Sequence, residues 1–186
     1  MTRRGFSALV LIVTASSAGC SNDGGVVVSS TTQPTPPVSV SPEKFASDMA
    51  MSAYERYWRL SDLAEAAPRA KNWRSELSAV MADPALTDYV NEIANLASIP
   101  AHAVGAYRRS PKVTSVSLAE PPRVVVTDCV DATDEHLISD KPAESGRNLD
   151  NPAQPRRYEF EAQIVRYRDS DRWLVQLVQA HLEKPC

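Results

Sequence analysis

Acid–base chemistry is the reaction type for which this sequence offers candidate side chains. Asp128, Asp131 and His136 lie in one short stretch, and carboxyl and imidazole groups are the usual proton carriers of enzymes. Asp128 alternates with valines, so in a strand it shares their buried face. These three groups are then candidate acid–base residues. The structural alternative is that both aspartates bond to backbone groups or pair with an arginine such as Arg157.

Motifs with a defined chemistry are missing from the sequence. It contains neither Gly-x-Ser-x-Gly nor His-Glu-x-x-His, and histidines 102, 136 and 181 do not have metal-ligand spacing. Beyond the first 25 residues, glycine occurs only at 105 and 146, which excludes a glycine-rich phosphate loop. The acids between 128 and 135 lack the alternate spacing and the glycine of a calcium loop. We therefore predict no metal, no cofactor and no established catalytic motif.

The N-terminus has the layout of an export signal over residues 1–19. Two arginines precede an apolar run at 6–14, and small residues lead to Cys20. The sequence Ser-Ala-Gly-Cys that ends at Cys20 resembles a bacterial lipobox, whose cysteine is diacylated and becomes the new N-terminus. The alternative is an ordinary cleaved signal peptide. The start Thr-Arg-Arg-Gly-Phe also resembles a twin-arginine signal, so the general and twin-arginine export routes both stay open, and either one places the chain outside the cytoplasmic membrane.

Cysteine count and charge agree with export. With Cys20 lipidated, Cys129 and Cys186 form an even pair, for which a disulfide is expected in an oxidising compartment. A catalytic thiol at Cys129 is the alternative, but its acidic neighbours Asp128 and Asp131 disfavour the thiolate form. Removal of residues 1–19 removes two arginines and changes the formal net charge from −3 to −5. A negatively charged chain is a poor partner for nucleic acid, because its phosphates need basic side chains.

A Ser/Thr/Pro-rich tether over residues 20–44 separates the lipidated cysteine from a folded domain at 45–186. The sequence Ser-Pro-Glu at 41–43 is a helix start. It is followed by apolar side chains at helical spacing at Phe45, Met49, Ala53, Tyr57, Leu60 and Ala64. A shorter helix is expected around 73–81, and a third begins at the Asp-Pro pair 83–84 and runs to residue 97.

Period-two alternation follows and predicts strands near 116–118 and at 123–130, 158–164 and 173–177. The polar turn 169–171 makes the last two a hairpin, and His181 continues the alternation of the last strand. Segment 131–157 is expected to be a long connection that contains a short strand at 136–138. Helices first and antiparallel strands second define an α+β fold.

The run Val-Val-Thr-Asp-Cys-Val-Asp at 125–131, the strand Arg-Trp-Leu-Val at 172–175 and the closing Cys186 resemble small actinobacterial lipoproteins, some of them carried by phages. That resemblance implies a nuclear-transport-factor-two-like domain, a cone of helices against a curved antiparallel sheet. It also implies a cavity between the layers, but no single activity.

The sequence therefore predicts a lipid-anchored, extracytoplasmic binding module whose partner is an envelope protein or a small apolar ligand. Self-association through the sheet face is a further possibility. Two alternative functions remain open at this point. One is a small-molecule carrier or acid–base enzyme that uses the cavity, and the other is a phage surface lipoprotein that excludes superinfecting phages.

Overall fold

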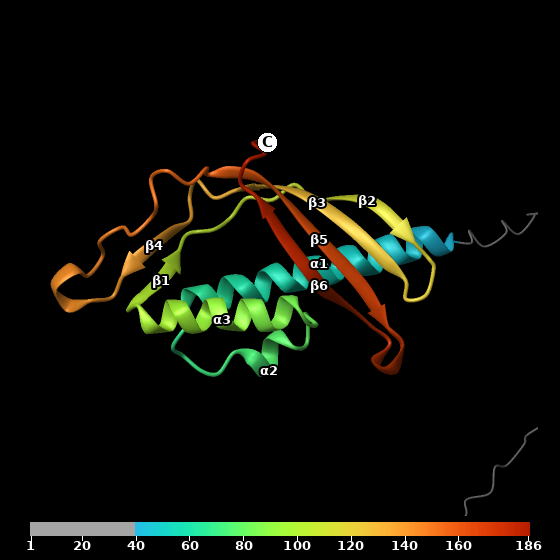
Figure 1. Ribbon diagram of the computed structural model, residues 1–186, viewed down its shortest axis with the longest axis horizontal. Coiled ribbons are helices and arrows are strands. Elements are labelled where there is room, and N and C mark those ends of the chain that lie inside the picture. Colours follow the sequence, from blue (N-terminus) through green and yellow to red (C-terminus); the bar gives the residue numbers. More distant parts are fainter. Residues whose placement is uncertain (1–39) are drawn as a thin grey trace, which may run out of the picture. The chain divides into compact units, whose positions relative to one another are not determined.

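The computed structural model describes residues 40–186, so the export signal, Cys20 and the tether up to residue 39 lie outside the described residues. The described part is an α+β domain, as the sequence predicts, with helices packed on one face of an antiparallel sheet (Figure 1). Its helices are α1 (Pro42–Ala66), α2 (Arg74–Leu77) and α3 (Ala85–Ser98). Its strands are β1 (Ala101–Val104), β2 (Lys112–Ser117), β3 (Arg123–Asp131), β4 (His136–Ser139), β5 (Arg157–Tyr167) and β6 (Arg172–His181). Within these residues no helix is long and apolar enough to cross a bilayer.

Helix α1 begins where the sequence predicts. The Ser41 hydroxyl accepts a hydrogen bond from the backbone N–H of Lys44 at 3.2 Å, and Pro42 occupies the first turn. The last three residues of segment 20–44 therefore belong to the helix. The N-cap satisfies one of the backbone donors that a helix start leaves without an intrahelical partner.

The buried face of α1 differs from the expected one. Phe45 and Met49 were expected in the core, but they are 52% and 37% exposed. Ala53, Tyr57 and Ala64 are buried as expected. In the first half of the helix, the small side chains of Ala46 and Ala50 face the sheet in place of Phe45 and Met49. Both faces have helical spacing, so periodicity alone does not separate them. The aromatic residues in the second half of α1, Tyr54, Tyr57 and Trp58, are buried in the same core.

The main sheet has the order β2-β3-β5-β6, with every neighbouring pair antiparallel. Hairpin β5–β6 closes at the predicted polar turn, where Asp171 takes a left-handed conformation with φ of 49°. One face of the sheet is buried under the helices. Its core side chains are Val124, Val126, Val130, Phe160, Ala162, Ile164, Trp173 and Val175.

A bulge in β6 changes which side chains face the helices. Ile164 pairs with Val175 but Ala162 pairs with Val178, so β6 contains one extra residue between these pairs. Leu177 and His181 consequently lie on the outer face, and not on the face of Trp173 and Val175 with which simple alternation groups them.

A second, two-stranded sheet joins β1 to β4. Strand β4 confirms the short strand expected at 136–138, whereas its partner β1 was not expected from the sequence. Gly105 turns the chain after β1 with φ of +91°, where a Cβ atom would collide with the Asp134 carbonyl oxygen. Near the C-terminal end of β3, Cys129 is joined to Cys186 by a disulfide, with Cα atoms 5.7 Å apart.

Candidate functional site

A groove of about 720 Å³ runs along the second half of α1. One wall is the helix and the other is the segment that leads into β2. The groove is of a size that holds a drug-sized ligand or a few residues of a peptide. Its lining residues are Tyr54, Glu55, Trp58, Arg59, Asp62, Leu63, Arg109 and Pro111.

Two aromatic rings, Tyr54 and Trp58, form the floor of this groove. They are 1% and 6% exposed, and they stand one helical turn apart on α1. The Trp58 ring centroid lies 5.0 Å from that of Phe160 on β5 and 5.4 Å from that of Tyr107. Because these rings are packed on several sides, they give the groove a rigid apolar base.

Arg109 crosses the groove wall and stacks on the same aromatic cluster. Its guanidinium carbon lies 4.1 Å from the Trp58 ring centroid and 5.3 Å from that of Tyr107, within the range of cation–π attraction. One guanidinium nitrogen reaches an Asp62 carboxylate oxygen at 2.6 Å. Burial raises the pKa of Asp62, and Arg109 partly opposes that increase. The ion pair therefore fixes the wall to the helix.

Asp128 holds the groove together from beneath. It is 1% exposed on the inner face of β3, as alternation predicts. One carboxylate oxygen accepts the Tyr54 hydroxyl at 2.8 Å, and the other accepts the backbone N–H of Ser110 at 2.5 Å. Burial raises the pKa of Tyr54, which keeps its hydroxyl a donor. Asp128 thus connects α1, β3 and the wall segment, and it does not line the groove.

The other two candidate acid–base residues lie elsewhere. Asp131 caps the end of β3 by accepting the Thr133 backbone N–H at 2.9 Å, and it lies 3.8 Å from Arg157. The hydrogen bond from the Thr133 hydroxyl and the nearby arginines lower the pKa of Asp131. His136 belongs to β4, where its Nδ1 lies 2.7 Å from an oxygen of Asp150. The structure therefore does not bring Asp128, Asp131 and His136 to a common cavity.

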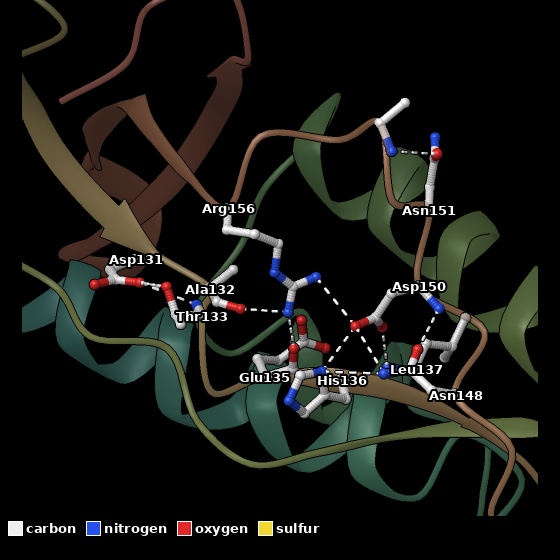
Figure 2. A network of polar contacts seen from close by, with 11 residues as sticks. Asp131, Ala132, Thr133, Glu135, His136, Leu137, Asn148, Asp150, Asn151 and Arg156 are labelled. Atoms are coloured by element: carbon white, nitrogen blue, oxygen red, sulfur yellow. Dashed lines mark hydrogen bonds and ion pairs between the residues drawn. The ribbon is translucent and has the colours of Figure 1, made fainter.

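Figure 2 shows that His136 belongs to a network at the start of β4. Asp150 accepts the Leu137 backbone N–H at 2.8 Å, and an Arg156 nitrogen lies 3.3 Å from the same carboxylate. Arg156 also donates to the backbone carbonyls of Ala132 and Glu135. These contacts fasten the 131–157 connection to the small sheet, which is a structural role.

A second cavity, of about 300 Å³, lies between α1, α3 and the small sheet. Its four acids come from separate parts of the chain: Glu65 from α1, Glu92 from α3, Glu135 from the turn before β4, and Asp150 from the connection before β5. Burial raises the pKa of Glu65 to about 8, and the Tyr89 hydroxyl donates to its carboxyl group at 2.5 Å. Burial also raises the pKa values of Glu92 and Glu135. Within residues 40–186 no three side chains gather as a metal site.

Sequence reasoning missed the residues of the groove. The apolar face predicted for the first helix runs through Ala53 and Tyr57 and does not include Tyr54 or Trp58. Arg109 lies in a connection with no recognisable motif. The one available signal was the spacing of four between two large aromatic residues, which also occurs in ordinary helix cores.

Comparison with known proteins informs the fold alone. No family model matches the chain, and no curated protein matches it. The structure is similar to the crystal structure of the intermembrane space region of chloroplast protein ARC6, with a TM-score of 0.52 and 15% sequence identity. The alignment covers 72% of this chain and 94% of the ARC6 region. At this identity the similarity concerns the arrangement of helices and strands and carries no function across.

Proposed function

We propose that the protein is a lipid-anchored binding module of the cell envelope that takes its ligand into the groove along α1. The observation that carries the proposal is the groove itself, which has a buried Tyr54–Trp58 floor and a wall held by Asp128. Apolar pockets with a few oriented polar groups are the usual form of ligand sites. The Arg109–Asp62 pair supplies those polar groups at the rim.

The proposed location rests on the sequence and on the cysteines. An export signal layout leads to Cys20, and the remaining two cysteines are bonded to each other, as is usual outside the cytoplasm. Lipid on Cys20 would keep the module at the membrane surface. The proposal includes the cone-shaped, nuclear-transport-factor-two-like form of the actinobacterial lipoproteins, for which helices on one face of an antiparallel sheet are a necessary feature.

Binding is favoured over acid–base catalysis because of the contacts of Asp128. Both of its oxygens are already bonded, to Tyr54 and to Ser110, and it has 1% exposure. A general base must reach a proton of its substrate directly or through one water molecule. Asp128 is instead placed to position the groove.

The chain contains three tryptophans, which allow a direct test of the groove. A screen of small apolar fragments, followed through indole N–H resonances, should produce hits that shift Trp58 and leave Trp173, a buried residue of β6, unchanged. Hits should weaken in Leu63→Asp, at a side chain that is 55% exposed on the groove rim, and persist in the control Leu182→Asp. Hits that move only Trp73, or no hits at all, would refute the groove as the binding site.

The anchor needs a separate test. Membrane fractionation of cells that express the full chain should find the protein with membranes, and Cys20→Ser should release it. Equal solubility of the two forms would contradict lipid anchoring while leaving the groove proposal intact.

A further inference from the structure

Strand β2 forms an edge of the main sheet, next to the groove. It pairs with β3 on one side, and no other strand of the described residues pairs with it. Pro111, which lines the groove, directly precedes its first residue, Lys112. Backbone N–H and C=O groups on the free side of an edge strand are a template for another extended chain. The groove and this edge therefore lie next to each other.

We propose that the occupant of the groove is an extended segment of another protein, which adds a strand to the edge of β2 and alternates apolar with acidic side chains. The proposal rests on the proposed function and names the partner of the same site. In this mode of recognition the backbone hydrogen bonds give affinity, and pockets for alternate side chains give specificity.

The length of the groove fits a short strand. Its helical wall runs from Tyr54 to Leu63, a rise of about 14 Å at 1.5 Å per residue. An extended chain covers that distance in about four residues. Two of those side chains would point toward α1, and the floor offers two aromatic rings, Tyr54 and Trp58, to receive them.

The register of β2 indicates what the intervening side chains would meet. Val113 pairs with buried Val126 on the inner face, whereas Lys112 pairs with Thr127 on the outer face. In an added strand, the neighbours of the inward apolar residues point outward. The exposed Lys112 is the charged group on that side, so a carboxylate is the complementary partner.

Charge around the site is opposite to that of the domain as a whole. Residues 40–186 contain 18 Lys and Arg against 22 Asp and Glu. The lining of the groove holds two arginines, Arg59 and Arg109, against two acids, Glu55 and Asp62, so its charges balance. The exposed Lys112, which follows Pro111 and lies outside the lining, adds one positive charge beside the groove. This local excess of positive charge favours acidic residues beside the apolar ones.

A random octapeptide library displayed on its messenger RNA tests the proposal. Selection would use the full chain without its export signal and with Cys20→Ser. The expected enrichment is an alternating pattern of aromatic or aliphatic residues with Asp or Glu. The best peptide should lose binding when two successive backbone amides are N-methylated, because that removes donors needed for strand pairing. Enrichment that survives N-methylation, or that shows no acidic preference, would overturn the proposal.

Charge reversal sharpens the test. In Lys112→Glu the enriched peptide should bind about fivefold to tenfold more weakly, and a peptide with Lys in place of its acids should gain, since one exposed pair changes from attraction to repulsion. The control Lys141→Glu changes an exposed lysine outside the sheet and should have no effect. Equal loss in both variants would exclude the assigned strand register.

Two outcomes separate this proposal from the proposed function. Fragments that shift Trp58 without any enrichment of peptides would leave the groove a site for small molecules and overturn the peptide partner. Binding of dodecanoate in place of peptides would identify a lipid-like ligand with the same combination of carboxylate and hydrocarbon. Failure of the fragment screen together with the library would reject both.

Discussion

Asp128→Asn is expected to destabilise the domain because the carboxylate accepts two hydrogen bonds in the core. An amide has one acceptor oxygen, and that oxygen must face the Ser110 backbone N–H, which cannot itself accept. The amide nitrogen then faces Tyr54, whose hydroxyl must turn and accept. Two bonds to a charged acceptor become two neutral ones. Since bonds to charged groups contribute about 1.5–3 kcal/mol and neutral ones about 1, the expected loss is about 2 kcal/mol.

Urea unfolding followed by circular dichroism measures this loss. The variant Tyr54→Phe removes the partner hydroxyl, so the double variant should lose less than the sum of the single changes, with a coupling of about 1 kcal/mol. Asp169→Asn, at an exposed turn position, is the matched control and should stay within about 0.5 kcal/mol of the parent chain.

Asp128 does not stabilise the domain through these bonds if Asp128→Asn unfolds at the same urea concentration as the parent, or if the coupling with Tyr54 is absent. A gain in stability would be more informative still. Catalytic groups are commonly held at a cost to stability, so a gain would return Asp128 to the list of acid–base candidates.

The remaining predictions concern other parts of the domain. Burial raises the pKa of Glu65 to about 8, so the folded state keeps a proton that the unfolded chain loses above about pH 4.5. Stability should therefore fall as pH rises between these values, by at most about 1.4 kcal/mol per pH unit, and Glu65→Gln should flatten this dependence in urea titrations. Replacing both Cys129 and Cys186 by alanine should lower the free energy of unfolding by about 4 kcal/mol, because the disulfide closes a loop between residues 57 positions apart and so restricts the unfolded chain. An unchanged melting temperature would contradict this. Gly105→Ala should destabilise far more than Gly146→Ala, because both have positive φ but only the first would place a Cβ atom against backbone, 1.8 Å from an oxygen. Equal melting temperatures of the two glycine variants would show that the close contact has no effect.

Local sequence patterns were sufficient to predict features that depend on one helix, strand or turn alone. Ser41 and Pro42 mark the start of α1 because an N-cap acts within one helical turn. The buried face of β3 follows from strict alternation, which places Asp128 with its neighbouring valines. The turn at 169–171 has polar residues between two alternating runs, and it does join β5 to β6.

Sequence patterns gave wrong predictions where the exposure of a side chain depends on how a neighbouring helix or strand packs. The exposed positions of Phe45 and Met49 depend on which side of α1 meets the sheet, and two faces of that helix have suitable spacing. The outward position of Leu177 depends on one extra residue in β6, which shifts the pairing with β5 and leaves no mark in composition.

The sequence by itself determined the order of the helices and of every strand except β1, the pair of cysteines available for a bond, the export signal layout and the absence of established catalytic motifs. These properties depend on residue type and short-range spacing. Only the tertiary structure decided that Tyr54 and Trp58 floor a groove, that Asp128 supports it, and that Asp131 and His136 lie apart. The physical reason is that each of these relations joins residues from different elements, whose mutual placement follows from close packing of the whole core.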